Sequence, residues 1–268
     1  MKRFVLGSSI DAIRDYFNVR AIVPKDWTPP IVVSPGDYTL ILTQIDPANL
    51  MLSSFGLTPS WAKQPMQILH ARAEGDKNLG NDPGFRGSKA IFLKPAFQKP
   101  LFSQRCIVVA DAYIEWSEDD LHAPYLVFLS HQERPIGLAG LYDVWRDLAT
   151  GDYLHSFSII TVPANSMLRK IGASRMPVIL TRGKEVRWLN PANSLSEMLN
   201  MLNIFPSKLM NAFPVSEEVA HIGPFNKDIL QPKGERLTKV QEKVIISRNG
   251  HYHKKKSDVS HWLGNTPI

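Results

Sequence analysis

One carboxylate in this sequence stands where acid–base chemistry could take place. Glu115 lies between Ile114 and Trp116, a few residues after the β-branched, apolar run at 107–109. In a β-strand, neighbouring side chains point to opposite faces, so Glu115 would face away from both apolar neighbours. Two interpretations follow. Glu115 is either a solvated outward residue, which is the common case for glutamate, or a group in a partly apolar cleft, where burial raises its pKa toward a value suited to proton transfer.

A second group of polar side chains occurs in residues 67–74, QILHARAE. If this segment is extended, His70, Arg72 and Glu74 share one face and can act on the same ligand. If it is helical, His70 and Glu74 form an ordinary i,i+4 surface pair. Residues 75–88 follow, and their Gly, Asn, Asp and Pro content predicts a loop.

The elements that position these groups are predicted to be mostly strands. The apolar run 107–109 is typical of a buried strand, and residues 38–45 and 157–162 have the same character. Residues 8–20 have apolar side chains at helical spacing behind a serine cap, which predicts a helix. The remaining predictions are a strand at 125–129, a glycine-containing apolar segment at 136–145, a helix start at 165–170, a strand at 178–180, and short helices at 184–189 and 194–202.

Charge and length permit an anionic partner without requiring one. The 268 residues include 31 Lys and Arg against 25 Asp and Glu, a net charge of +6. So mild an excess is compatible with nucleic acid and equally with a solvated surface. The chain is long enough to bury a substantial core.

The cysteine content excludes two kinds of structure. Cys106 is the single cysteine, so neither an internal disulfide framework nor a cysteine-based zinc site can form in one chain. Its place beside the apolar run predicts a buried, unreactive thiol. No glycine-rich phosphate loop of known spacing occurs, and we expect no cofactor and no metal. Without a secretory leader or a membrane-length apolar run, we expect a cytoplasmic protein with no membrane partner.

The last part of the chain differs in composition. Charge density rises from Lys233, and Asn249-Gly250 between two alternating runs predicts a tight hairpin. Lys254, Lys255 and Lys256 then form a basic tail. That tail is either a frayed, solvated terminus or an electrostatic contact for phosphates.

Six short strings occur in an order and spacing that resemble the SRAP (SOS-response-associated peptidase) family. The strings are FGLTPSW (55–61), HARAE (70–74), ADAYIEW (110–116), IIT (159–161), SRMP (174–177) and FPVS (213–216). The resemblance covers about residues 30–216. It implies an α+β fold: a single SRAP-like domain of curved, mostly antiparallel β-sheets with flanking short helices. We therefore expect a domain at 1–232 and a basic extension at 233–268.

The resemblance also implies a chemistry. Family members bind single-stranded DNA and capture abasic sites covalently through a cysteine that directly follows the initiator Met. Its amine and thiol condense with the sugar aldehyde to give a thiazolidine. An Asn, a Glu and a His assist the reaction.

This chain departs from the pattern at three of those four positions. The second residue is Lys2, the Asn position holds His70, and the His position holds Ser174, whereas Glu115 is unchanged. Arg72, Glu74 and Arg175 match neighbouring family positions. We therefore predict that the family's thiazolidine cross-link cannot form. Because Lys2 is too bulky for ordinary Met excision, we expect Met1 to be retained.

The first functional hypothesis is a DNA-binding family member without the stable cross-link, acting in a DNA-damage response. Single-stranded or abasic-site DNA would contact Arg72, Arg175, Glu74 and Arg3, and Trp61 would stack on a base. Trp61 is equally well explained as a core aromatic residue.

Three alternatives remain open. The Met1 α-amine or the Lys2 side chain could form a transient imine with the abasic aldehyde, with Glu115 moving protons, which gives lyase-like strand cleavage. Ser174, His70 and Glu115 are the residue types of a hydrolase triad, although geometry decides whether a triad exists. Last, the chain could be a non-catalytic interaction protein that kept only the fold.

Overall fold

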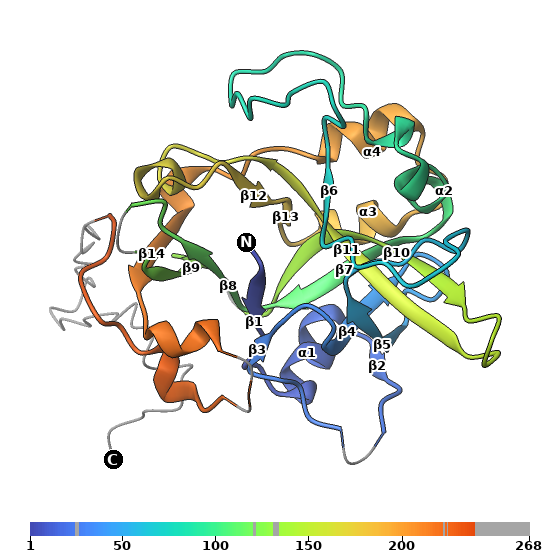
Figure 1. Ribbon diagram of the computed structural model, residues 1–268, viewed down its shortest axis with the longest axis horizontal. Helices are drawn as coiled ribbons and strands as arrows, with labels where there is room; N and C mark the ends of the chain where they lie inside the picture. The colour runs from blue at the N-terminus through green and yellow to red at the C-terminus, as the bar shows by residue number, and fades with distance from the viewer. Residues whose placement is uncertain (25–26, 120–121, 131–133, 222, 224, 239–268) are drawn as a thin grey trace, which may run out of the picture.

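The computed structural model describes residues 1–24, 27–119, 122–130, 134–221, 223 and 225–238. Two sheets form its centre (Figure 1). The smaller has the strand order β14-β9-β8-β1-β3. Its strands are β1 (Arg3–Val5), β3 (Val32–Val33), β8 (Ala112–Trp116), β9 (Pro124–Leu129) and β14 (Met210–Pro214).

The larger sheet has the order β12-β11-β10-β7-β4-β5-β2, with β6 added on β11 and β13 on β10. Its strands are β2 (Arg20–Ala21), β4 (Tyr38–Thr43), β5 (Asn49–Phe55), β6 (His70–Arg72), β7 (Arg105–Ala110), β10 (Ile136–Arg146), β11 (Tyr153–Pro163), β12 (Arg175–Pro177) and β13 (Ile179–Leu180). Most neighbours are antiparallel, and the α+β fold of curved, mostly antiparallel sheets is confirmed.

The larger sheet closes on itself because β11 pairs with β10 on one side and with β5 on the other. The closure brings Phe157 opposite Phe55, and their rings stack with centroids 5.4 Å apart. Gly140 lies in the tightly packed wall of this ring, where an added Cβ would come within 2.8 Å of Cys106 Sγ. A side chain at Gly140 would therefore clash with its neighbours, and Cys106 is a fully buried thiol, as the sequence predicts.

Short helices flank the sheets. They are α1 (Ile10–Phe17), α2 (Pro95–Ser103), α3 (Lys184–Leu189) and α4 (Leu195–Met201), with 3-10 turns at Ile91–Leu93, Leu168–Ile171, Ser207–Leu209, Glu217–Ala220 and Lys227–Leu230. The Ser9 side chain caps α1, as the sequence predicts, and Ser194 with Glu197 forms a capping box at α4. Instead of the helix expected from residue 165, a 3-10 turn forms.

Three other expectations concern the last part of the chain. The predicted hairpin near Asn249 and the basic tail at 254–256 lie outside the described residues. The boundary at 232/233 stays a prediction, although residues 233–238 run beside β14: the Lys233 amide donates to the Pro214 carbonyl at 2.8 Å, and the Leu237 amide donates to the Ala212 carbonyl at 2.8 Å. Within the described part of the chain, no helix is both long and apolar enough to cross a membrane.

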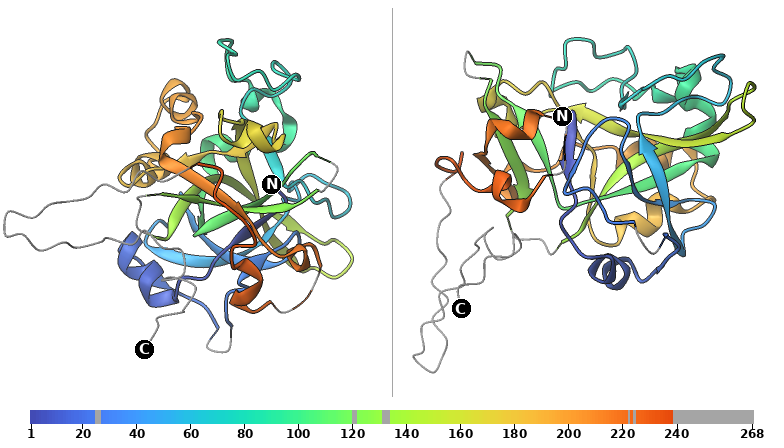
Figure 2. Two further views of the ribbon diagram at one scale, coloured as in Figure 1. Left: turned by 90° about the vertical axis from the view of Figure 1, so that its left-hand side faces the viewer. Right: turned by 60° about the horizontal axis from the view of Figure 1, so that its bottom comes forward.

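The start of the chain lies at the middle of the molecule, beside strands of both sheets (Figures 1 and 2). Residues 75–88 form the predicted loop, which rises above β6 and leads toward α2 (Figure 1). Strand β1 carries the chain start to this position because it pairs with β8, with Arg3 opposite Ile114.

Candidate functional site at the chain start

The α-amine of Met1 is held by the carboxylate of Glu115. The amine nitrogen donates to Oε1 at 2.9 Å and lies 2.7 Å from Oε2. The register of β1 on β8 produces this contact, because it places the chain start beside the end of β8. The Met1 side chain is 1% exposed and packs against the core, which fixes the amine in place.

Glu115 belongs to the second of the two environments that the sequence left open. Its side chain is 13% exposed, and its neighbour Ile114 is fully buried. Burial raises the pKa of the Glu115 carboxyl, while the Met1 amine opposes that rise. A carboxyl with a raised pKa that contacts an amine is placed to accept a proton from it and to return one.

His70 is the third group of this site. It stands on β6, which is extended and pairs in parallel with β11, so the helical interpretation of residues 67–74 is wrong. Among the described residues, the buried Nε2 of His70 has no hydrogen-bond partner. Burial, together with the positive charges of the Met1 amine and Arg175, lowers the pKa of His70 to about 4. The ring is therefore neutral at neutral pH.

An arginine cluster lies beside His70. Arg175 of β12 donates to Glu74 Oε2 at 2.8 Å and to the Thr161 hydroxyl at 3.0 Å. Arg72 of β6 and Arg175 both reach the Asn81 side-chain oxygen, at 3.0 and 2.9 Å. Strand β11 joins the two arginines because it pairs with both β6 and β12.

The remaining predicted residues are more scattered. Lys2 is exposed and adjoins the amine. Trp61 is 59% exposed, so its interpretation as a core aromatic residue is wrong. Arg3 is buried and donates to the carbonyls of Val219 and His221, the latter at 2.8 Å, rather than facing the amine.

The structure brings His70 and Glu115 to one place but forms no Ser174–His70–Glu115 triad. Ser174 is exposed, and His70 Nε2 has no hydrogen-bond partner among the described residues, so the Ser174–His70 bond that a hydrolase needs is not formed.

Two residues of the site were not singled out from the sequence. Thr161 receives two hydrogen bonds from Arg175, at its hydroxyl and its carbonyl. The string 159–161 that carries the family resemblance contains Thr161 and could have flagged it. Asn81 is one asparagine in a loop rich in Asn, Asp and Gly, and no sequence pattern distinguishes it.

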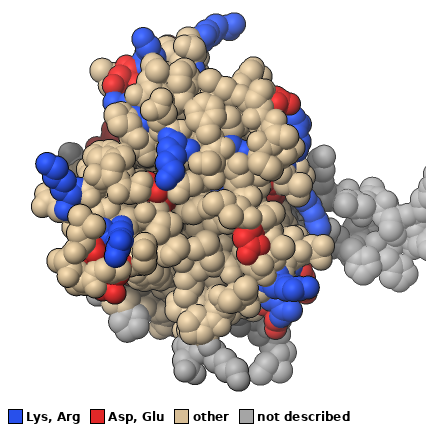
Figure 3. Space-filling model, turned by 90° about the vertical axis from the view of Figure 1, so that its right-hand side faces the viewer, with Lys and Arg blue, Asp and Glu red and all other residues tan. Residues whose placement is uncertain are grey.

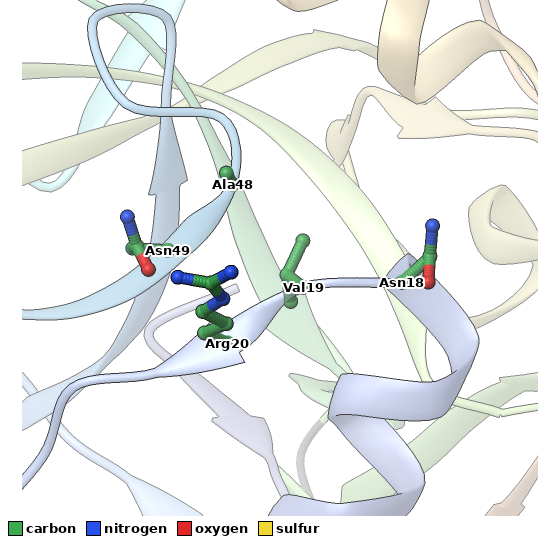
Figure 4. Close-up of a pocket in the computed structure, with 5 residues that line it drawn as sticks. All are labelled: Asn18, Val19, Arg20, Ala48 and Asn49. Atoms are coloured by element: carbon green, nitrogen blue, oxygen red, sulfur yellow. The ribbon is translucent and has the colours of Figure 1, made fainter.

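Two clefts lie outside this cluster. One, of about 290 Å³, adjoins it through Glu74 and is lined also by Phe85, Lys89 and Asn203. The other, of about 430 Å³, lies between the end of α1 and the start of β5 (Figure 4). It contains none of the residues of the site at the chain start.

Charge is dispersed on the face seen in Figure 3, where Lys and Arg side chains are separated by neutral ones. Searched over the described residues, the structure has no group of three or more His, Cys, Asp or Glu side chains able to hold a metal ion.

The fold and site define a class of protein: a mostly antiparallel sheet that closes on itself, beside a smaller sheet that presents an N-terminal amine to a largely buried glutamate. The family model described as SOS response associated peptidase (SRAP) matches residues 2–222. The chain therefore belongs to the SRAP family.

Named relatives and a solved structure agree with this assignment. The chain is 33% identical to the abasic site processing proteins YoqW and YoaM of Bacillus subtilis, over 81% of this chain and 92% and 91% of theirs. A crystal structure of a protein from Bacteroides thetaiotaomicron superposes with a TM-score of 0.74 at 25% identity, covering 87% of this chain and 99% of that one.

Proposed function

We propose that this protein binds abasic sites in single-stranded DNA without forming the stable thiazolidine. The names of its relatives give abasic site processing as their role. Thiazolidine formation requires a thiol adjacent to the reacting amine. The single thiol, Cys106, is fully buried in β7, and burial raises its pKa well above the usual value. These facts support loss of the cross-link.

One observation carries the chemical part of the proposal: the Met1 α-amine rests on Glu115 at 2.9 Å. Glu115 would accept a proton from the amine, and the freed lone pair would attack the aldehyde carbon of the ring-opened sugar. The resulting carbinolamine loses its hydroxyl as water when Glu115 returns the proton, which leaves a protonated imine and restores the Glu115 carboxylate.

The imine has two exits when no thiol closes a ring. Water can add back and release the aldehyde, so capture is reversible. Alternatively, a base removes a proton from the sugar carbon next to the imine, and the 3′ C–O bond breaks with departure of the phosphate, which cleaves the strand. The neutral imidazole of His70, next to the amine, is a suitable proton acceptor for that step.

Binding would use the groups around the amine. Arg72 and Arg175 offer guanidinium groups suited to backbone phosphates. The exposed indole of Trp61 offers a surface on which a base can stack.

The deciding experiment uses an oligonucleotide with one abasic site and an intact control of the same sequence, each incubated with the protein with and without borohydride. We expect a covalent adduct only with the abasic strand and only with borohydride, because reduction converts the imine to a stable amine. An adduct that survives denaturation without borohydride would contradict the predicted loss of a stable cross-link.

Two controls assign the reacting nitrogen. Peptide mass mapping of the reduced adduct should place it on Met1, and the same measurement reports whether Met1 begins the mature chain. In Lys2→Arg, the second candidate amine is removed while the positive charge is kept, so the adduct should persist. Its loss in that variant would assign the chemistry to Lys2 and overturn the role given to Met1.

A further inference from the structure

Asn81 occupies an unusual position between the two arginines. Its side-chain oxygen accepts from Arg72 Nη2 at 3.0 Å and from Arg175 Nη1 at 2.9 Å. Two guanidinium groups thus converge on one neutral oxygen. Guanidinium groups form their strongest hydrogen bonds with anionic oxygens, those of carboxylate or phosphate.

The charge in this cluster is only partly balanced. Glu74 pairs with Arg175 at 2.8 Å. Over the described residues, Arg72 has no carboxylate within 4 Å, and its buried Nε has no hydrogen-bond partner. A buried donor without a partner is costly, which indicates that the bonding of Arg72 is incomplete in the free protein.

We infer that the Asn81 carboxamide closes a phosphate site between Arg72 and Arg175 in the free protein, and that a DNA phosphodiester displaces it on binding. This inference rests on the proposed function, because it concerns regulation of the same site. The amide oxygen takes the place that a phosphate oxygen would fill, so the loop at 75–88 competes with DNA for the arginines.

The loop is built so that Asn81 can leave while its anchors stay. Asn78 holds the turn through two bonds with Asp82, both of 2.9 Å, and Lys94 binds Asp76 at 2.6 Å where the loop begins. None of these bonds involves the Asn81 side chain. The Asn78 carbonyl also accepts from Arg72 Nη2, and this backbone bond can stay when the Asn81 side chain rotates away. Displacement of Asn81 therefore requires a side-chain rotation rather than refolding of the loop.

The backbone of Asn81 dictates which variants are informative. Its φ of 55° is a conformation that Asn, Asp and Gly adopt more readily than other residues. Asn81→Gly therefore removes the competing oxygen without backbone strain. Asn81→Asp keeps the shape and replaces the neutral oxygen with a charged one, which holds both arginines more strongly.

The test measures affinity for intact single-stranded DNA across a salt series. For Asn81→Gly we expect binding several-fold tighter than wild type. For Asn81→Asp we expect it about tenfold weaker, because charge-assisted bonds are roughly twice as strong as neutral ones. The salt dependence of Asn81→Asp should also become shallower, by about 0.7 in log–log slope for each phosphate that the arginines no longer neutralise.

Leu79→Asp is the matched control, because Leu79 is 68% exposed in the same loop and the change adds the same charge. It should weaken binding much less than Asn81→Asp. Equal effects of the two aspartates would mean that general repulsion, rather than occupation of the site, explains the result. Wild-type affinity in both Asn81 variants would likewise overturn the inference.

A DNA-free measurement separates this inference from the proposed function. The side-chain Nε–H signals of Arg72 and Arg175 can be followed by NMR during titration with inorganic phosphate. We expect them to shift at lower phosphate concentration in Asn81→Gly than in wild type, whether or not abasic DNA forms an imine. Signals that stay unchanged in both proteins would exclude a phosphate site between the arginines.

Discussion

Met1 and Glu115 form an ion pair with the amine nitrogen 2.7 Å from Oε2, although 114 residues separate them in the chain. The pairing of β1 with β8 produces this contact, and the buried Met1 side chain holds it. The fold thus holds the backbone amine of Met1 in a fixed position beside the Glu115 carboxylate.

Replacing Glu115 with Gln should slow imine formation while leaving DNA binding intact. The amide keeps the shape but cannot accept the proton of the amine, so we expect the rate of borohydride trapping to fall about 10²–10⁴-fold, the usual range for a general acid–base group. Trapping time courses at saturating abasic DNA measure the change. An unchanged rate would remove Glu115 from the chemistry.

The same variant should unfold more easily. Loss of the carboxylate leaves the Met1 amine without its partner in a mostly buried position, and we expect the free energy of unfolding to fall by about 1–3 kcal/mol. Urea denaturation measures it. Because the trapping assay is run under conditions where the variant is folded, the two effects are separable.

Extending the chain by Gly-Ser before Met1 should abolish trapping. Two extended residues move the free amine by about 7 Å, and the Met1 nitrogen becomes an amide that cannot form an imine. Trapping on abasic DNA should therefore be lost, while affinity for intact DNA measured at the same salt is largely kept. If the adduct persists, peptide mapping should be repeated, since another amine would then be responsible.

The sequence predicts many of the strands and helices that surround this site, but it does not predict the long-range contact that completes it. The β-branched run at 107–109 and the capped helix at 8–20 have strong local patterns, and both elements form. Helix α2 escaped prediction because Pro95 and Pro100 break the usual pattern, although Pro at a first turn is compatible with a helix. The pair Met1–Glu115 depends on a long-range strand register, which no local pattern encodes.

The same distinction applies to individual site residues. Glu115 and Arg175 can be predicted as site residues because each lies in a sequence string that carries the family resemblance. Asn81 cannot be predicted in this way, because its contacts form only where a loop meets β6 and β12. The sequence alone does not distinguish the two interpretations of Trp61, a base-stacking residue or a core aromatic residue, because they differ only in the exposure of the side chain.

His70 should make the protein less stable in acid. Its pKa is lowered to about 4 in the folded state, against about 6.5 when unfolded. As the pH falls from 6.5 toward 4, the unfolded chain takes up the proton first, so stability that is present above pH 6.5 is lost through that interval. The loss should approach about 3 kcal/mol. Urea denaturation at pH 7, 5.5 and 4.5 measures it.

His70→Asn is the matched variant for that measurement, because it restores the residue type that the family resemblance implies. Its stability should decline less between pH 6.5 and 4 than that of wild type. Burial raises the pKa of Glu115, which acts in the opposite direction over the acid range, but this contribution is common to both proteins to a first approximation. Parallel curves for the two proteins would show that the His70 pKa is not lowered.

Trp61→Ala should weaken binding of single-stranded DNA without destabilising the fold. The indole is 59% exposed, so its removal costs little core packing, whereas loss of one base stack costs about 1–3 kcal/mol, or roughly five- to 150-fold in affinity. Fluorescence anisotropy at fixed salt measures the affinity, and urea denaturation measures the stability. Phe102→Ala removes another exposed aromatic side chain, on α2, and should leave DNA affinity unchanged. Equal affinity losses in the two variants would mean that Trp61 provides no specific stacking surface.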